Sequence, residues 1–168
     1  MDRLFFPTDL KADDSGAISG IAWKFGVPDR IGDEIEPGAF KGMKLPLPML
    51  AFHDMGDPIG TWDTATEKSD GLHISGRLLI ADVARAREVH ALVKAGAVKG
   101  LSIGFMTKGT PRIRPGGGRT IKSLDLFEVS LVTVPMHPGA RVTSAKSAVA
   151  ALQLAASINR AALALKGA

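Results

Sequence analysis

Three short segments contain residue types that could together perform nucleophilic chemistry. His53 follows an apolar run, Ser102 lies between Gly100 and Gly104, and Glu128 is embedded in the apolar run Leu-Phe-Glu-Val-Ser. A serine hydroxyl is a poor nucleophile at neutral pH, so it needs a general base within hydrogen-bond reach. That base needs a third group to fix its tautomer. We expect the two glycines to leave room for a substrate backbone near Ser102. Residue types alone carry this hypothesis only weakly, because most Ser, His and Glu residues are not catalytic.

The composition narrows the chemistry further. The chain has 168 residues and no cysteine, which excludes disulfides, thiolate catalysis and cysteine–zinc sites. The Gly116–Gly118 run lacks the Lys-Ser/Thr that follows a phosphate loop, so nucleotide binding is not indicated. A metal site at His53, Asp54 and Asp57 is disfavoured, because Gly56 and Pro58 oppose the helix that such sites use. We therefore expect an enzyme with neither metal nor cofactor.

Charge and hydropathy indicate which partners to expect. The net charge is +4, and most of the basic residues lie in the second half of the chain. They are dispersed, and the chain has no tyrosine and no aromatic stacking platform, so a protein partner is favoured over nucleic acid. No run of ~20 apolar residues is present, so no membrane span is expected. The first residues do not resemble a signal peptide, which favours an intracellular protein.

The spacing of apolar and turn-forming residues predicts a β-rich α+β fold. Val83, Ala86 and Val89 recur at helical spacing, with Asp82 as N-cap and Gly96 as C-terminal cap, so a helix is expected over 82–95. The expected strands are 17–25, 31–35, 49–53, 59–64, 72–79, 101–107, 121–126 and 128–135, with a helical turn at 37–42 and a mobile loop at 111–119.

This set of elements favours a compact barrel of about seven strands wrapped by helices, with two separate sheets as the main alternative. After Val142 the chain becomes rich in alanine, and apolar residues recur at helical spacing. We therefore expect a domain over 1–142, followed by a helix or tail over 143–168.

An ordered set of segments resembles the prohead (capsid maturation) serine proteases of tailed bacteriophages. Each segment is modest alone, but their order and spacing from about residue 16 to 142 make the set specific. The matching segments are residues 32–40, 48–54, 58–62, 70–72, 100–105 and 126–135. The resemblance implies a fold like that of the herpesvirus assemblins, a β-barrel surrounded by a few helices. It also implies cleavage of scaffold or capsid precursor inside the immature shell, in the host cytoplasm.

The resemblance assigns a role to each of the three residues. By position, Ser102 is the nucleophile, His53 is its base and Glu128 is the third member. Because assemblins use a second histidine, His137 is the alternative third member. Asp54 is a weaker rival, since neighbouring residues on a strand point to opposite faces.

Other residues near these segments carry further expectations. Assemblins stabilise the oxyanion with an arginine-bearing loop, which makes Gly118 and Arg119 the candidates for that role here. Glu128 could instead form a salt bridge at the barrel rim, with Arg119 or Lys122. Ser130 lies on the same face as Glu128, where packing is favoured over a supporting hydrogen bond.

Three further expectations concern function. The alternative to an active protease is a catalytically inactive assembly factor that binds scaffold on the same fold, and the presence of all three residues argues against it. The small residues Thr143-Ser144-Ala145 mark a region where the protease could cleave itself. Self-association of the protease is an additional expectation.

Overall fold

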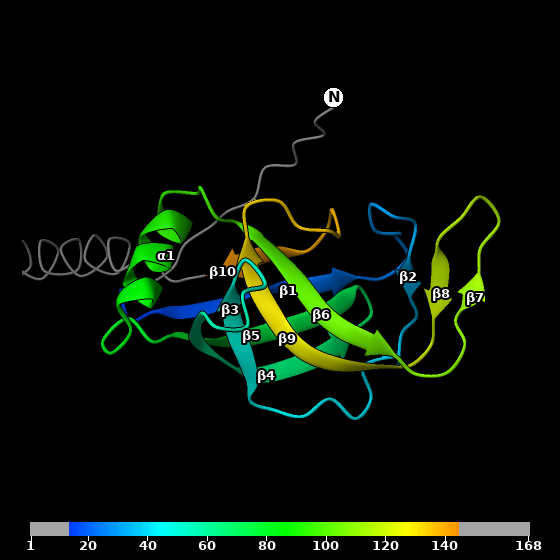
Figure 1. Cartoon of the computed structure of the whole chain (residues 1–168), viewed down its shortest axis with the longest axis horizontal. Coiled ribbons are helices and arrows are strands. Elements are labelled where there is room, and N and C mark those ends of the chain that lie inside the picture. Colours follow the sequence, from blue (N-terminus) through cyan, green and yellow to red (C-terminus); the bar gives the residue numbers. More distant parts are fainter. Residues whose placement is uncertain (1–13, 145–168) are drawn as a thin grey trace, which may run out of the picture.

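The computed structural model describes residues 14–144, which form ten strands and one α-helix (Figure 1). In chain order they are β1 (Ala17–Lys24), β2 (Glu34–Ile35), β3 (Leu47–Ala51), β4 (Pro58–Lys68), β5 (Gly71–Leu78), α1 (Ala84–Lys94), β6 (Gly100–Thr107), β7 (Arg112–Ile113), β8 (Arg119–Ile121), β9 (Leu124–Val132) and β10 (Arg141–Ser144).

Seven of these strands close into a barrel in the order β1-β10-β6-β9-β3-β4-β5. The pairings are antiparallel except between β3 and β9, which run parallel, so the barrel is mixed. A separate small sheet has the order β2-β8-β7, and Figure 1 shows it and α1 at opposite ends of the barrel. The predicted seven-stranded barrel is thus confirmed. The sequence also predicted a few helices around the barrel, but the described residues contain only one helix, α1.

Apolar side chains that alternate inward along the strands fill the barrel. The fully buried ones include Trp62, Met49 and Leu131, and Trp62 donates its indole N–H to the Val129 carbonyl at 2.9 Å. Burying one such side chain contributes about 1.5–3 kcal/mol. Gly76 permits the close pairing of β4 and β5, because a Cβ there would overlap the Thr61 carbonyl. The core therefore combines large apolar residues with a glycine where backbones meet.

The two strands expected over 121–126 and 128–135 are one strand, β9. The reason is an irregularity in its pairing with β6: Gly104 pairs with Glu128 but Phe105 pairs with Leu126. Phe127 is therefore an extra residue in β9, a β-bulge that shifts the alternation of inward and outward side chains by one position. In the sequence this shift looks like a break between two strands.

Other predicted boundaries also change. Helix α1 begins after an N-cap at Val83 rather than Asp82, and no side chain caps it. Gly96 follows its end with a φ of 74°, as predicted for a C-terminal glycine. The predicted domain boundary at residue 142 falls inside β10, which pairs with β1. The expected second helix lies outside the described residues.

Candidate active site

His53 lies in a turn directly after β3, not at a strand end as predicted. The strand stops at Ala51, and the next two residues have left-handed backbone conformations, with φ of 54° for Phe52 and 62° for His53. Such conformations are costly for residues with a Cβ, so other contacts must hold them. The Phe52 N–H donates to the Leu131 carbonyl at 3.0 Å, and the His53 N–H donates to Ser130 Oγ at 3.1 Å.

Helix α1 supports the same turn from outside. Arg85 donates from Nε to Asp57 at 3.1 Å, and its guanidinium lies 5.9 Å from the centre of the Phe52 ring, within cation–π range. The Asp54 side chain accepts a hydrogen bond at Oδ1 from the Gly56 N–H, at 2.8 Å. Asp54 was expected to face away from His53 on a strand, but both residues lie in the turn, and the Asp54 carboxylate closes that turn.

The structure brings His53, Ser102 and Glu128 together. His53 Nε2 is 2.8 Å from Ser102 Oγ, and His53 Nδ1 is 2.7 Å from Glu128 Oε1. Ser102 and Glu128 lie on the neighbouring strands β6 and β9, and the turn after β3 brings the histidine across both. A carboxylate can only accept, so Nδ1 carries the proton and Nε2 is free to accept from the Ser102 hydroxyl.

The three side chains differ in their exposure. Ser102 is buried, with 6% of the residue exposed, and the Glu128 side chain is 5% exposed, whereas the His53 side chain is 44% exposed. The low exposure of Glu128 strengthens its hydrogen bonds, because water competes less for the carboxylate. The alternative role for Glu128, a rim salt bridge to Arg119 or Lys122, is wrong, since those cations pair with Asp33 and Glu36.

Gly100 and Gly104 were expected to leave room for a substrate backbone. Instead, they leave room for side chains of the protein itself. A Cβ on Gly104 would overlap Glu128 Oε1 and lie 2.9 Å from its Cδ. A Cβ on Gly100 would lie 2.6 Å from Cδ of Pro135. Gly104 therefore lets the Glu128 side chain fold over β6 towards His53. The sequence shows that residue 104 is a glycine, but the reason for it becomes clear only from the register of β6 on β9, which pairs Gly104 with Glu128.

His137, the alternative third member, is used elsewhere. It is 1% exposed and packs edge-on against Trp23, with ring centres 4.3 Å apart. Its Nε2 lies 2.8 Å from the Val27 carbonyl, and its Nδ1 accepts the Gly139 N–H at 3.0 Å. Both ring nitrogens thus bind main-chain atoms, which leaves neither available to orient His53. These contacts define a neutral imidazole that fixes the loop before β10.

The buried position of His137 predicts a pH-dependent stability. Burial lowers the pKa of His137 below its ordinary value near 6.5, although the Val27 carbonyl and Asp29 act in the opposite direction. The unfolded chain then binds this proton more readily than the folded chain does. The stabilisation is complete above pH ~6.5 and is lost as the pH falls through the folded-state pKa.

Thermal unfolding between pH 7.5 and 5 checks this expectation. The melting temperature of the wild type should fall more steeply with acidification than that of His137→Gln, whose side chain does not titrate. Parallel curves for the two proteins would show that His137 does not contribute to the pH dependence.

The residues expected to stabilise an oxyanion lie in the small sheet. Arg119 Nε donates to Asp33 at 3.0 Å and Nη2 contacts the same carboxylate, and these bonds raise the pKa of the guanidinium. Gly118 has a φ of 79° and backs against the main chain of Gly32. Both residues thus join β8 to the chain before β2. Their oxyanion role stays a prediction that these contacts do not support.

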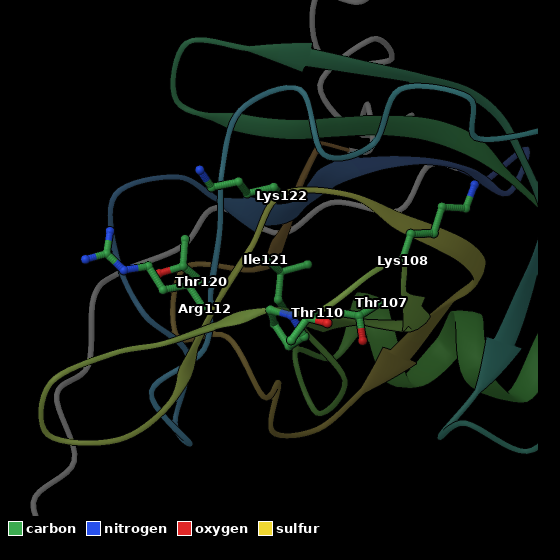
Figure 2. Close-up of a pocket in the computed structure, with 8 residues that line it drawn as sticks. Thr107, Lys108, Thr110, Arg112, Thr120, Ile121 and Lys122 are labelled. Carbon is green, nitrogen blue, oxygen red and sulfur yellow. The ribbon is translucent and has the colours of Figure 1, made fainter.

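A small hollow of about 90 Å³ lies at the end of β6, near the small sheet. Figure 2 shows the charged ends of Arg112 and Lys122 pointing away from Lys108, so the cations do not converge on one point. None of His53, Ser102 and Glu128 lines this hollow. Within residues 14–144, no group of three or more acidic or histidine side chains could hold a metal ion, and no helix is long and apolar enough to cross a membrane.

A serine, a histidine and a carboxylate in a hydrogen-bonded row form the constellation of serine hydrolases. Comparison with known proteins identifies the particular family. The profile of the caudovirus prohead serine proteases matches residues 6–154, and the chain belongs to this family.

Individual relatives agree with this assignment. The chain is 35% identical over 153 residues to the capsid polyprotein of Pseudomonas phage PAJU2, covering 87% of this chain and 23% of that protein. It is 33% identical over 139 residues to the prohead protease of Enterobacteria phage HK97, and 32% identical over 126 residues to that of Escherichia phage T5. These matches cover 79% and 71% of this chain but only 61% and 58% of the two proteases, so the chain spans less than two thirds of each relative.

One solved structure extends the comparison to the fold. The KSHV protease, crystallised with a hexapeptide phosphonate inhibitor, superposes with a TM-score of 0.54. The match covers 75% of this chain and 63% of that one at 15% sequence identity. The barrel is therefore of the herpesvirus protease type, as the resemblance to the prohead proteases implied.

Proposed function

We propose that this chain is a serine endopeptidase that uses Ser102 as nucleophile, His53 as general base and acid, and Glu128 as the group that orients His53. One observation carries the proposal. His53 Nε2 lies 2.8 Å from Ser102 Oγ, and His53 Nδ1 lies 2.7 Å from Glu128 Oε1. This is the geometry needed to activate a hydroxyl that is otherwise a poor nucleophile.

The reaction follows from these contacts. Ser102 Oγ attacks the scissile carbonyl carbon while its proton moves to His53 Nε2, and Glu128 stabilises the imidazolium that forms. The carbon–nitrogen bond then breaks as Nε2 gives the proton to the leaving amine. A water molecule attacks the resulting acyl group and passes a proton to Nε2, which returns it to Ser102 as the acid product leaves.

The edge of β6 next to Ser102 suits an extended polypeptide. The Leu101 N–H donates to Ala140 at 3.4 Å, so at Leu101 the main chain faces β10 rather than β9. Because main-chain groups alternate along a strand, the N–H and C=O of Ile103 point to the same side. Among the described residues, β10 pairs with β6 only at Gly100. A substrate segment could therefore pair with β6 beyond Leu101 and place a peptide bond beside Ser102.

The names of the relatives indicate the substrate class. Two are prohead proteases, and the third is a capsid polyprotein of which the matched region makes up 23%. We propose that the substrate is the capsid precursor or scaffold protein, cleaved inside the immature shell in the host cytoplasm. Self-cleavage near Thr143-Ser144 is less direct, because Ser144 pairs with Ser19 and β10 must first leave the barrel.

Labelling with a fluorophosphonate tests the proposal without knowledge of the substrate. An active serine attacks the phosphorus and becomes covalently modified, whereas an unactivated surface serine does not. We expect one label per chain, mapped by peptide mass spectrometry to Ser102. A catalytically inactive assembly factor on the same fold would remain unlabelled, and that result would overturn the assignment.

A further inference from the structure

A fourth side chain, Ser130, connects two members of the triad. Ser130 Oγ is 2.7 Å from Glu128 Oε2 and 3.1 Å from the main-chain nitrogen of His53. Glu128 returns to the same histidine through the 2.7 Å contact between Oε1 and Nδ1. The contacts thus form a closed ring that begins at the His53 backbone and ends at its imidazole.

The direction of each hydrogen bond in this ring is determined. A backbone N–H can only donate, so Ser130 Oγ accepts from His53. The single hydroxyl proton of Ser130 then goes to Glu128 Oε2, because a carboxylate can only accept. Ser130 is 0% exposed, so water does not compete for these bonds. Of the two roles considered for Ser130 in the sequence, packing was favoured, but these bonds correspond to the other role, a supporting hydrogen bond.

The histidine needs such support more than the other two residues do. Its side chain is 44% exposed, so packing alone does not fix the orientation of the ring. Its backbone φ of 62° is a conformation that non-glycine residues rarely adopt. The main-chain bond to Ser130 holds that conformation, and the bond from Ser130 to Glu128 holds the carboxylate that orients the ring.

We propose that Ser130 is a positioning residue, which fixes the backbone of His53 and the carboxylate of Glu128 with one hydroxyl group. The assignment rests on the proposed function and acts through it, since Ser130 does not touch the reacting atoms. Without the hydroxyl, Glu128 Oε2 loses its hydrogen-bond donor and the turn at His53 loses a hydrogen bond. The imidazole ring is then less often in position to accept the proton of Ser102.

The rate of fluorophosphonate labelling at Ser102 measures this effect directly. Ser130→Ala should slow labelling about tenfold to a hundredfold, the scale of a misplaced catalytic group. Ser130→Thr keeps the hydroxyl and should recover most of the rate. Ser75→Ala, the same change at an exposed position on β5, is the matched control and should label like the wild type. Melting curves of all variants establish that each is folded at the assay temperature.

A double-variant cycle separates positioning from general destabilisation. If Ser130 acts through Glu128, Ser130→Ala should slow labelling far less in a Glu128→Gln background than in the wild type. Equal fold-changes in both backgrounds, or an unchanged rate for Ser130→Ala alone, would overturn the inference. Absence of labelling in the wild type would instead overturn the proposed function.

Discussion

Ser102→Ala is expected to abolish cleavage of a co-expressed capsid precursor. Alanine keeps the strand but removes the oxygen that attacks the carbonyl carbon, and His53 then has no nucleophile to activate. Removing the nucleophile of a serine protease lowers kcat by about 10⁶-fold, which is below detection in a co-expression experiment. Gel analysis and intact masses of the precursor report the outcome.

This variant should remain folded, so loss of activity can be read as loss of chemistry. Ser102 Oγ makes a 2.8 Å contact with His53 Nε2, and losing one such hydrogen bond costs about 1 kcal/mol. Ser75→Ala serves again as the control for the same chemical change on another strand. Precursor that is still cut at the normal sites by folded Ser102→Ala would exclude Ser102 as the nucleophile.

The three residues could be selected from the sequence because each lies in a short segment whose order along the chain is specific. Their proximity could not be derived. It depends on a turn in which Phe52 and His53 both have positive φ, a conformation that non-glycine residues adopt in only a few per cent of cases. The strand pattern around His53 predicted continuation of β3, which would have pointed the side chain elsewhere.

The roles of the two supporting residues, Ser130 and Gly104, could not be derived from the sequence for a related reason. Ser130 bonds to the main chain of a residue 77 positions away, and Gly104 matters only because it pairs with Glu128. The bulge at Phe127 decides that pairing, and it interrupts the period-two pattern by which a strand is predicted from sequence. The barrel itself was predictable, because strand content and turn spacing are local properties. The register between strands is not a local property.

Glu128→Gln is expected to lower kcat by about 10⁴-fold with little change in the fold, the effect of the equivalent change in another serine protease. The structure supplies the reason. Ser130 donates its proton to Oε2, so a glutamine would place its carbonyl oxygen there and turn its NH₂ group towards His53 Nδ1. His53 Nδ1 must then accept a hydrogen bond from the NH₂ group. The ring proton therefore sits on Nε2, which cannot take another proton from Ser102.

His137→Gln provides the comparison that distinguishes the two candidate third members. It should lower the melting temperature, because His137 is buried against Trp23 and binds two main-chain groups. Below its own melting transition it should cleave precursor and react with fluorophosphonate at rates close to those of the wild type. If His137→Gln were folded but inactive while Glu128→Gln kept its activity, the third member would be His137. The hydrogen bond from His53 to the buried Glu128 carboxylate favours the opposite result.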